Sequence, residues 1–125
     1  LDFIRASGGV PGEIFNLKKY AEKSRAGFQR GKERGFKTQI RFAFIERIAS
    51  AEFASERGIF HYHSYNGKGE TYNGYGKFHV VERLEQGHWK ILFDYDSNEN
   101  GTIDKADFDA GFSLNDWSVL IKPRN

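Results

Sequence analysis

The chain has 125 residues, a length suited to one domain that buries its own core without disulfides or metal ions. It contains no Cys, which excludes thiolate metal sites, and it shows neither a signal peptide nor an apolar run of about 20 residues, so we expect a soluble cytoplasmic or periplasmic protein without a membrane partner. The net charge is +2, and residues 1–60 carry 12 Lys and Arg against 7 interspersed Asp and Glu, a mixture that favours a solvated helix face over a nucleic-acid surface.

The first regular element expected is a helix from residue 13 to about residue 31. Apolar or small side chains recur there at the spacing of one helix face, with Lys and Glu between them: Leu17, Tyr20, Ala21, Ser24 and Phe28. This pattern is typical of an amphipathic helix, and Gly31 and Gly35 would end it.

From Thr38 onward the period changes to the alternation of a strand. Strands are expected from residue 38 to about 53, over 59–65, over 77–84 and over 89–95. Turns are expected at Asn66-Gly67, at Asn73-Gly74 and around Gly87, because these dipeptides favour hairpins. The sum is an α+β fold in which the helix packs on one face of a curved antiparallel sheet of four to six strands. A short helix over 107–112 and an apolar segment over 117–121 that packs back would follow.

Residues 96–107 have the pattern of an EF-hand calcium loop. Oxygen-bearing residues stand at the positions where such a loop places its ligands: Asp96, Asn98, Asn100, Thr102 (through its carbonyl), Asp104 and Asp107. Gly101 occupies the sixth position, where the loop turns sharply. Asp107 is shorter than the usual Glu, and no second loop is present, so we expect a weak or structural calcium site. A plain Asx and Gly turn is the alternative.

Two adjacent segments carry a resemblance to a known family. Residues 76–83 (GKFHVVER) and 86–95 (QGHWKILFDY) resemble the last two strands of the nuclear transport factor 2-like superfamily, in particular its SnoaL-like and ketosteroid-isomerase-like members. The resemblance implies a cone-shaped, cystatin-like domain over residues 1–95, with a ligand pocket and often a homodimer. The resemblance also implies a long N-terminal helix that lids the pocket. We expect either that this helix precedes Leu1 in a longer chain or that something else covers the pocket. The tail over residues 96–125, with its calcium-type loop, is not part of the usual domain.

The candidate catalytic residues are Asp94, His61 and His63. The two histidines stand two apart in a strand and therefore share a face, whereas alternation places Asp94 on the face opposite Trp89. A carboxylate in an apolar cavity of this superfamily commonly takes a proton from carbon. If the histidine face is instead solvent-exposed, Tyr62 and its neighbours would face inward. The candidate ligand-binding residues are Tyr62, Tyr75, His79 and Trp89; a zinc site including His79 is disfavoured because the spacing demands no third ligand.

Three functions compete, and the sequence leaves open whether the protein is an enzyme. The first is a small-molecule-binding SnoaL-like domain with a structural calcium site, whose ligand is a small apolar or aromatic molecule. The second is an acid–base enzyme of the isomerase, dehydratase or cyclase type that uses a pocket Asp or His. The third is a dimeric interaction module ordered by calcium. Calcium is the only cofactor implied, and no organic cofactor is expected.

Overall fold

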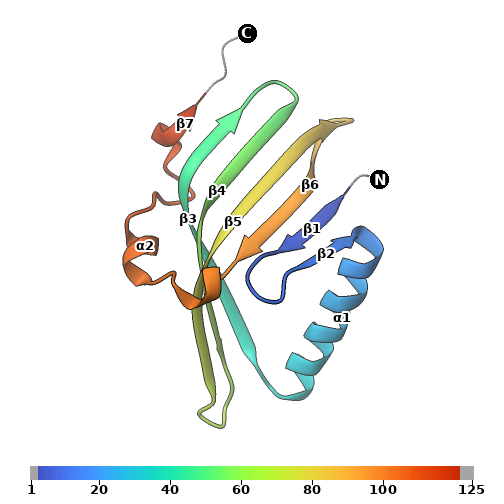
Figure 1. The fold of residues 1–125 in the computed structure, drawn as a ribbon, viewed down its shortest axis with the longest axis vertical. Helices are drawn as coiled ribbons and strands as arrows, with labels where there is room; N and C mark the ends of the chain where they lie inside the picture. The colour runs from blue at the N-terminus through green and yellow to red at the C-terminus, as the bar shows by residue number, and fades with distance from the viewer. Residues whose placement is uncertain (1–2, 122–125) are drawn as a thin grey trace.

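The computed structural model describes residues 3–121, which form one seven-stranded sheet with a long helix at one edge (Figure 1). Its elements are β1 (Ile4–Ser7), β2 (Glu13–Asn16), α1 (Leu17–Glu33), β3 (Lys37–Ala49), β4 (Phe53–Tyr65), β5 (Thr71–Glu85), β6 (His88–Ser97), α2 (Lys105–Asp109) and β7 (Leu120–Ile121). The strand order is β2-β1-β6-β5-β4-β3-β7. The expected α+β class is confirmed. The sheet is mixed, however, because β1 runs parallel to β6 and β7 parallel to β3.

The centre of the sheet is an antiparallel meander of the four long strands β3 to β6. The expected turns after Asn66 and at Gly87 join these strands. The turn expected at Asn73-Gly74 is wrong, because both residues lie inside β5, opposite His63 and Tyr62 of β4. Continuous pairing with β4 therefore outweighs the local turn preference of this dipeptide.

Two β-bulges decide which way the side chains point. One lies in β3 at Ile45, where Phe44 pairs with Gly58 and Glu46 pairs with Arg57. A Cβ on Gly58 would lie 2.0 Å from the carbonyl oxygen of Ala43, so only glycine permits this approach of β4 to β3. The second bulge lies in β6 around residue 92, where the partners step from Ile91 to Phe93. Each extra residue reverses the alternation beyond it.

The register defines two faces of the sheet. We call the face that carries Arg47, Glu56 and Glu82 the pocket face, and the face that carries Ile59, His61 and Tyr75 the tail face. Directly paired residues share a face, and the pairs Arg47–Glu56, Ile59–Lys77 and His61–Tyr75 anchor these assignments.

The helix α1 lies on the pocket face at the β1–β2 edge. Its Tyr20 ring stacks on Phe3, with ring centroids 5.6 Å apart, and lies under the guanidinium of Arg5. The helix starts later than expected, because residues 13–16 form β2 and the side chain of Asn16 caps the helix by accepting a hydrogen bond from the Lys19 amide.

The tail after β6 wraps around the sheet. It first crosses the tail face, where Phe108 of α2 contacts His61, Tyr75 and Arg41. Phe112 then pairs with Phe44 at the free edge of β3, and β7 continues along the same edge. The short helix is α2 over Lys105–Asp109, shifted from the expected 107–112, because Asp104 and Asp107 form a capping box at its start.

The core is small. Among residues 3–121, four apolar residues are buried (Ala43, Phe44, Ile59 and Phe78), and the Phe78 ring meets the rings of Phe42 and Phe44 edge-on. Within residues 3–121, no helix has the length and apolar character needed to span a membrane.

Candidate functional site

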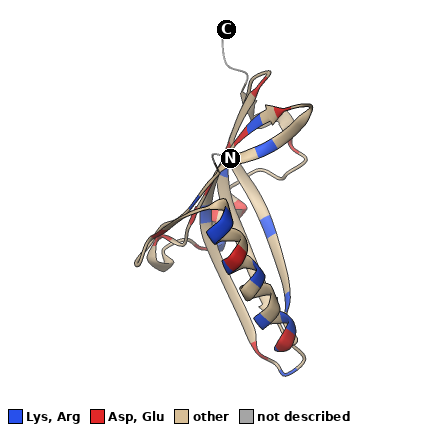
Figure 2. Ribbon diagram, turned by 90° about the vertical axis from the view of Figure 1, so that its right-hand side faces the viewer, with Lys and Arg blue, Asp and Glu red and all other residues tan. Residues whose placement is uncertain are grey.

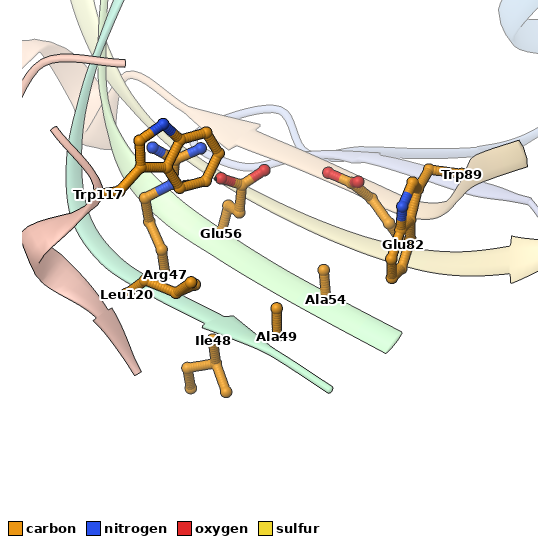
Figure 3. Close-up of a pocket in the computed structure, with 9 residues that line it drawn as sticks. All are labelled: Arg47, Ile48, Ala49, Ala54, Glu56, Glu82, Trp89, Trp117 and Leu120. Atoms are coloured by element: carbon orange, nitrogen blue, oxygen red, sulfur yellow. Dashed lines mark hydrogen bonds and ion pairs between the residues drawn. The ribbon is translucent and has the colours of Figure 1, made fainter. Parts of the chain in front are cut away.

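A pocket of about 260 Å³ opens on the pocket face near the edge of β3 that pairs with β7 (Figure 3). Three neighbouring strands, the start of β6 and the returning tail all contribute to it. Its lining residues are Arg47, Ile48, Ala49, Ala54, Glu56, Glu82, Trp89, Trp117 and Leu120. Ala49 and Ala54 are directly paired, and their small side chains leave the space that the larger residues surround.

Arg47 anchors one end of the pocket. Its side chain is only 4% exposed, and its guanidinium lies between the rings of Trp117 and Phe44, 4.0 and 4.2 Å from their centroids. Its Nε donates to Glu56 Oε2 at 2.6 Å and its Nη1 donates to the Leu114 carbonyl at 2.8 Å. The bond to Leu114 and the stacking on Trp117 attach the tail to the pocket face.

The second polar feature is a pair of carboxyl groups. Glu56 on β4 and Glu82 on β5 point toward one another in the pocket (Figure 3). Burial raises the pKa of Glu82, the charge of Glu56 and a hydrogen bond with it raise it further, and the charge of Arg47 acts in the opposite sense. Glu82 therefore ionises less readily than a solvated carboxyl group would.

Two indoles form the apolar walls. Trp89 stands beside Glu82, and Trp117 covers Arg47 at the other end (Figure 3). They are the only two tryptophans of the chain, and they are 47% and 61% exposed, so a bound molecule would find aromatic surface that is not yet covered.

The structure separates the three residues that were expected to act together. Asp94 lies on the pocket face with Trp89 and Ile91, because the bulge around residue 92 reverses the alternation that would have placed it opposite them. His61 and His63 point to the tail face. Asp94 is therefore not beside either histidine, and the expectation that alternation sets Asp94 opposite Trp89 is wrong.

Asp94 has its own surroundings outside the pocket lining. Its Oδ1 lies 3.7 Å from Nη1 of Arg5, whose Nη2 donates to Asp96 at 2.6 Å. Burial raises the pKa of Asp94, the Arg5 charge lowers it, and the Asp96 charge raises it. The ion pairs of Arg5 with Asp94 and Asp96 link β1 to β6.

The histidines occupy polar clusters on the tail face. His61 is hydrogen-bonded to Arg41 and Asn73 and stacks on Tyr75 at 4.5 Å between centroids. His79 is hydrogen-bonded to Ser55 at 2.8 Å. Of the four predicted ligand-binding residues, Trp89 lines the pocket, Tyr62 is on the pocket face but outside the lining, and Tyr75 and His79 are on the tail face.

Sequence reasoning missed Arg47, Glu56, Glu82 and Trp117. A signal exists for Glu82, which follows Val80 and Val81 in a segment otherwise suited to a half-buried strand. An ionisable residue in such a segment points to a partner or a function. No local pattern indicates Trp117, which reaches the site because the tail returns to β3.

The calcium-type loop has two different halves. In the second half, Gly101 has a positive φ of 82°, Asp104 is the N-cap of α2, and Asp107 stands three residues later. In the first half, Asp96 is engaged by Arg5 and Ser7, and Asn98 and Asn100 accept hydrogen bonds from the amides of Asn100 and Val10. Thr102 bonds to the Glu99 carbonyl.

The loop fits calcium in the type of its donors, which are all oxygens. The positions of these donors differ from those of a formed calcium site. Across residues 3–121, no three His, Asp or Glu side chains gather closely enough to hold a metal ion. Calcium binding here would require Asp96 to leave Arg5, and it stays a prediction.

The fold is shared with solved structures. No family model and no curated protein matches the sequence. A candidate calcium/calmodulin-dependent protein kinase II association domain from Xanthomonas campestris matches with a TM-score of 0.59 and 15% identity, over 77% of this chain and 65% of that one. A nuclear transport factor 2-like protein of unknown function from Shewanella oneidensis MR-1 matches at 0.55 and 19%, over 77% and 72%. A candidate ketosteroid isomerase from Shewanella frigidimarina matches at 0.50 and 17%, over 77% and 73%. The chain therefore has the nuclear transport factor 2-like fold, and at these identities the likeness concerns the fold alone.

Proposed function

We propose that this protein binds a small molecule in the pocket between Trp89 and Trp117. The observation that carries the proposal is the convergence of two carboxyl groups and a buried arginine in a cavity walled by two indoles. Binding sites for small molecules combine apolar walls with a few placed polar groups in this way. The volume of about 260 Å³ suits a ligand of one ring or a short chain.

The alternative of acid–base chemistry has one observation in its favour, the Glu56–Glu82 pair. Burial and the neighbouring Glu56 raise the pKa of Glu82, and a carboxyl group in such surroundings can give a proton to a bound molecule or take one from it. In this alternative Glu82 and Glu56 take the role that the sequence suggested for Asp94 and the histidines.

A fragment screen tests the binding proposal. Neutral, anionic and cationic fragments are added to isotope-labelled protein, and the indole N–H signals of Trp89 and Trp117 are followed by NMR. We expect some fragments to shift both signals, and Trp89→Ala to weaken those fragments. Fragments that shift only signals outside the pocket, or none at all, would contradict the proposal.

The same fragments test the acid–base alternative. Each binder is incubated with the protein in D₂O and its carbon-bound hydrogens are followed by mass spectrometry. Deuterium uptake that is lost in Glu82→Gln would support catalysis, and binding without any uptake would leave the protein a binder.

A further inference from the structure

The pocket contains more negative than positive charge. Its ionisable residues are Arg47, Glu56 and Glu82, and the guanidinium of Arg47 is matched by Glu56 at 2.6 Å. Glu82 has no positively charged partner among the pocket residues. Arg47 pairs with Glu56, and Glu56 lies between Arg47 and Glu82 (Figure 3). A second positive group brought by a ligand would balance this carboxyl.

Arg47 is poorly placed to bind an anion instead. Its guanidinium carbon lies within 4.2 Å of the centroids of two rings, and Nε and Nη1 are already bonded to Glu56 and to the Leu114 carbonyl. Since only 4% of its side chain is exposed, a carboxylate ligand would have to displace these partners and approach past Glu56.

The walls suit a cation as well. The Trp89 indole stands beside the Glu82 carboxyl (Figure 3), and about half of its surface is uncovered. A positive group at that point would meet a carboxylate and could lie over the face of an aromatic ring, which is a common way to hold organic ammonium groups. Ala49, Ala54 and Leu120 then offer an apolar surface for the rest of the ligand.

We propose that the ligand of this pocket is a small organic ammonium compound, with its positive group between Glu82, Glu56 and Trp89 and its apolar body over Ala49 and Ala54. This inference deepens the proposed function and rests on it. The raised pKa of Glu82, which comes first from burial and then from the charge of Glu56, supports it, because a ligand cation would offset the same cost of ionisation.

Three probes of similar size and different charge test the inference: 2-phenylethylammonium, 2-phenylethanol and phenylacetate. Binding is followed by tryptophan fluorescence, which reports on this pocket alone because both tryptophans of the chain line it. We expect the ammonium compound to bind about tenfold more tightly than the alcohol, the size of one charge-assisted hydrogen bond, and phenylacetate to bind most weakly.

Glu82→Gln should remove about a tenfold advantage of the ammonium compound over the alcohol, since it keeps the shape and removes the charge. Glu46→Gln is the matched control: Glu46 lies beside Arg47 in β3, but it points to the tail face and pairs with Arg57, so the preference should persist. Circular-dichroism melting establishes that both variants fold.

Equal or tighter binding of the alcohol or of phenylacetate would overturn the ammonium inference and leave small-molecule binding intact. A lack of any response to the ammonium compound would overturn it as well. Fragments of the screen above that still shift the indole signals in that case would show that binding survives while the charge preference fails.

Discussion

Glu82 is a pocket residue whose ionisation the fold disfavours. Its ordinary pKa of 4.5 is raised by burial and by Glu56, so the folded state holds this proton more tightly than the unfolded state. Below pH 4.5 the group is protonated in both states and costs nothing. As the pH rises above 4.5, the unfolded state releases this proton first. The folded state releases it only as the pH passes the raised pKa, so the free energy of unfolding falls over this interval.

Glu82→Gln should therefore stabilise the ligand-free protein at pH 7 and have little effect below pH 4.5. The expected gain is roughly 0.5–1 kcal/mol, kept small because solvent still screens part of this carboxyl. Urea unfolding at pH 7 and at pH 4 measures it. Glu46→Gln, which breaks an exposed ion pair with Arg57, should give no gain at pH 7. A loss of stability in Glu82→Gln at pH 7 would mean that the ionised carboxyl is well satisfied.

At the scale of the elements, the alternation of side chains located the four long strands and the amphipathic period predicted α1. The strand expected from residue 38 to about 53 is wrong at its end, because a turn at residues 50–52 separates β3 from β4. Neither pattern contains the bulges at Ile45 and around residue 92, because a bulge depends on the partner strand as well as on the local sequence. This is why Asp94 was expected on the wrong face. Trp117 joins Arg47 across 70 positions of sequence, a contact that only the complete path of the tail explains.

The tail also changes what the calcium-type loop would do. Asp96 is the first expected ligand, yet it holds Arg5 at 2.6 Å and so links β6 to β1. Calcium would have to compete with this guanidinium, which agrees with the weak site expected from Asp107. The loop is thus joined at one end to the sheet and at the other to α2.

We expect added calcium to raise the melting temperature of chelator-treated protein. Once free calcium is tenfold above the dissociation constant, ligand linkage adds about 1.4 kcal/mol to the free energy of unfolding. Asp96→Asn should reduce the shift, because it removes the negative charge of a calcium ligand while its amide oxygen can still accept a hydrogen bond from Arg5. Asp109→Asn, on α2 outside the loop and paired with Lys105, should keep it. No shift up to millimolar calcium would retire the site.

At the scale of the whole molecule, the isolated chain exposes more surface than its mass requires. Its accessible area is 9032 Å², whereas a compact monomer of 14.4 kDa exposes about 6,800 Å². The excess of about 2,200 Å² is larger than the roughly 800 Å² that each partner buries in a standard interface. The helix α1 carries six Lys and Arg against two Glu (Figure 2), so its share of the exposed surface is mostly basic.

An apolar stretch across three strands is the best surface for a second copy. On the pocket face, Ile40 stands opposite Tyr62, and Phe42 stands opposite Phe60. Tyr72 of β5 continues the stretch across the sheet. Ile40, Phe42 and Tyr72 are 52%, 47% and 51% exposed. Contiguous apolar surface of this kind marks an interaction site, and a homodimer would cover it in both copies.

Light scattering coupled to size-exclusion chromatography should therefore find a dimer, and Ile40→Lys should weaken it at least about tenfold, because a buried ammonium without a partner disfavours association. Ile14→Lys is the matched control. Ile14 is 71% exposed on β2 and lies on the tail face, so its charge should leave the dimer intact. A monomer at every concentration would contradict self-association. If Ile14→Lys dissociates the dimer and Ile40→Lys leaves it intact, the contact between the copies lies on the tail face, where α2 already covers part of β4. The apolar stretch around Ile40 would then not be the dimer contact.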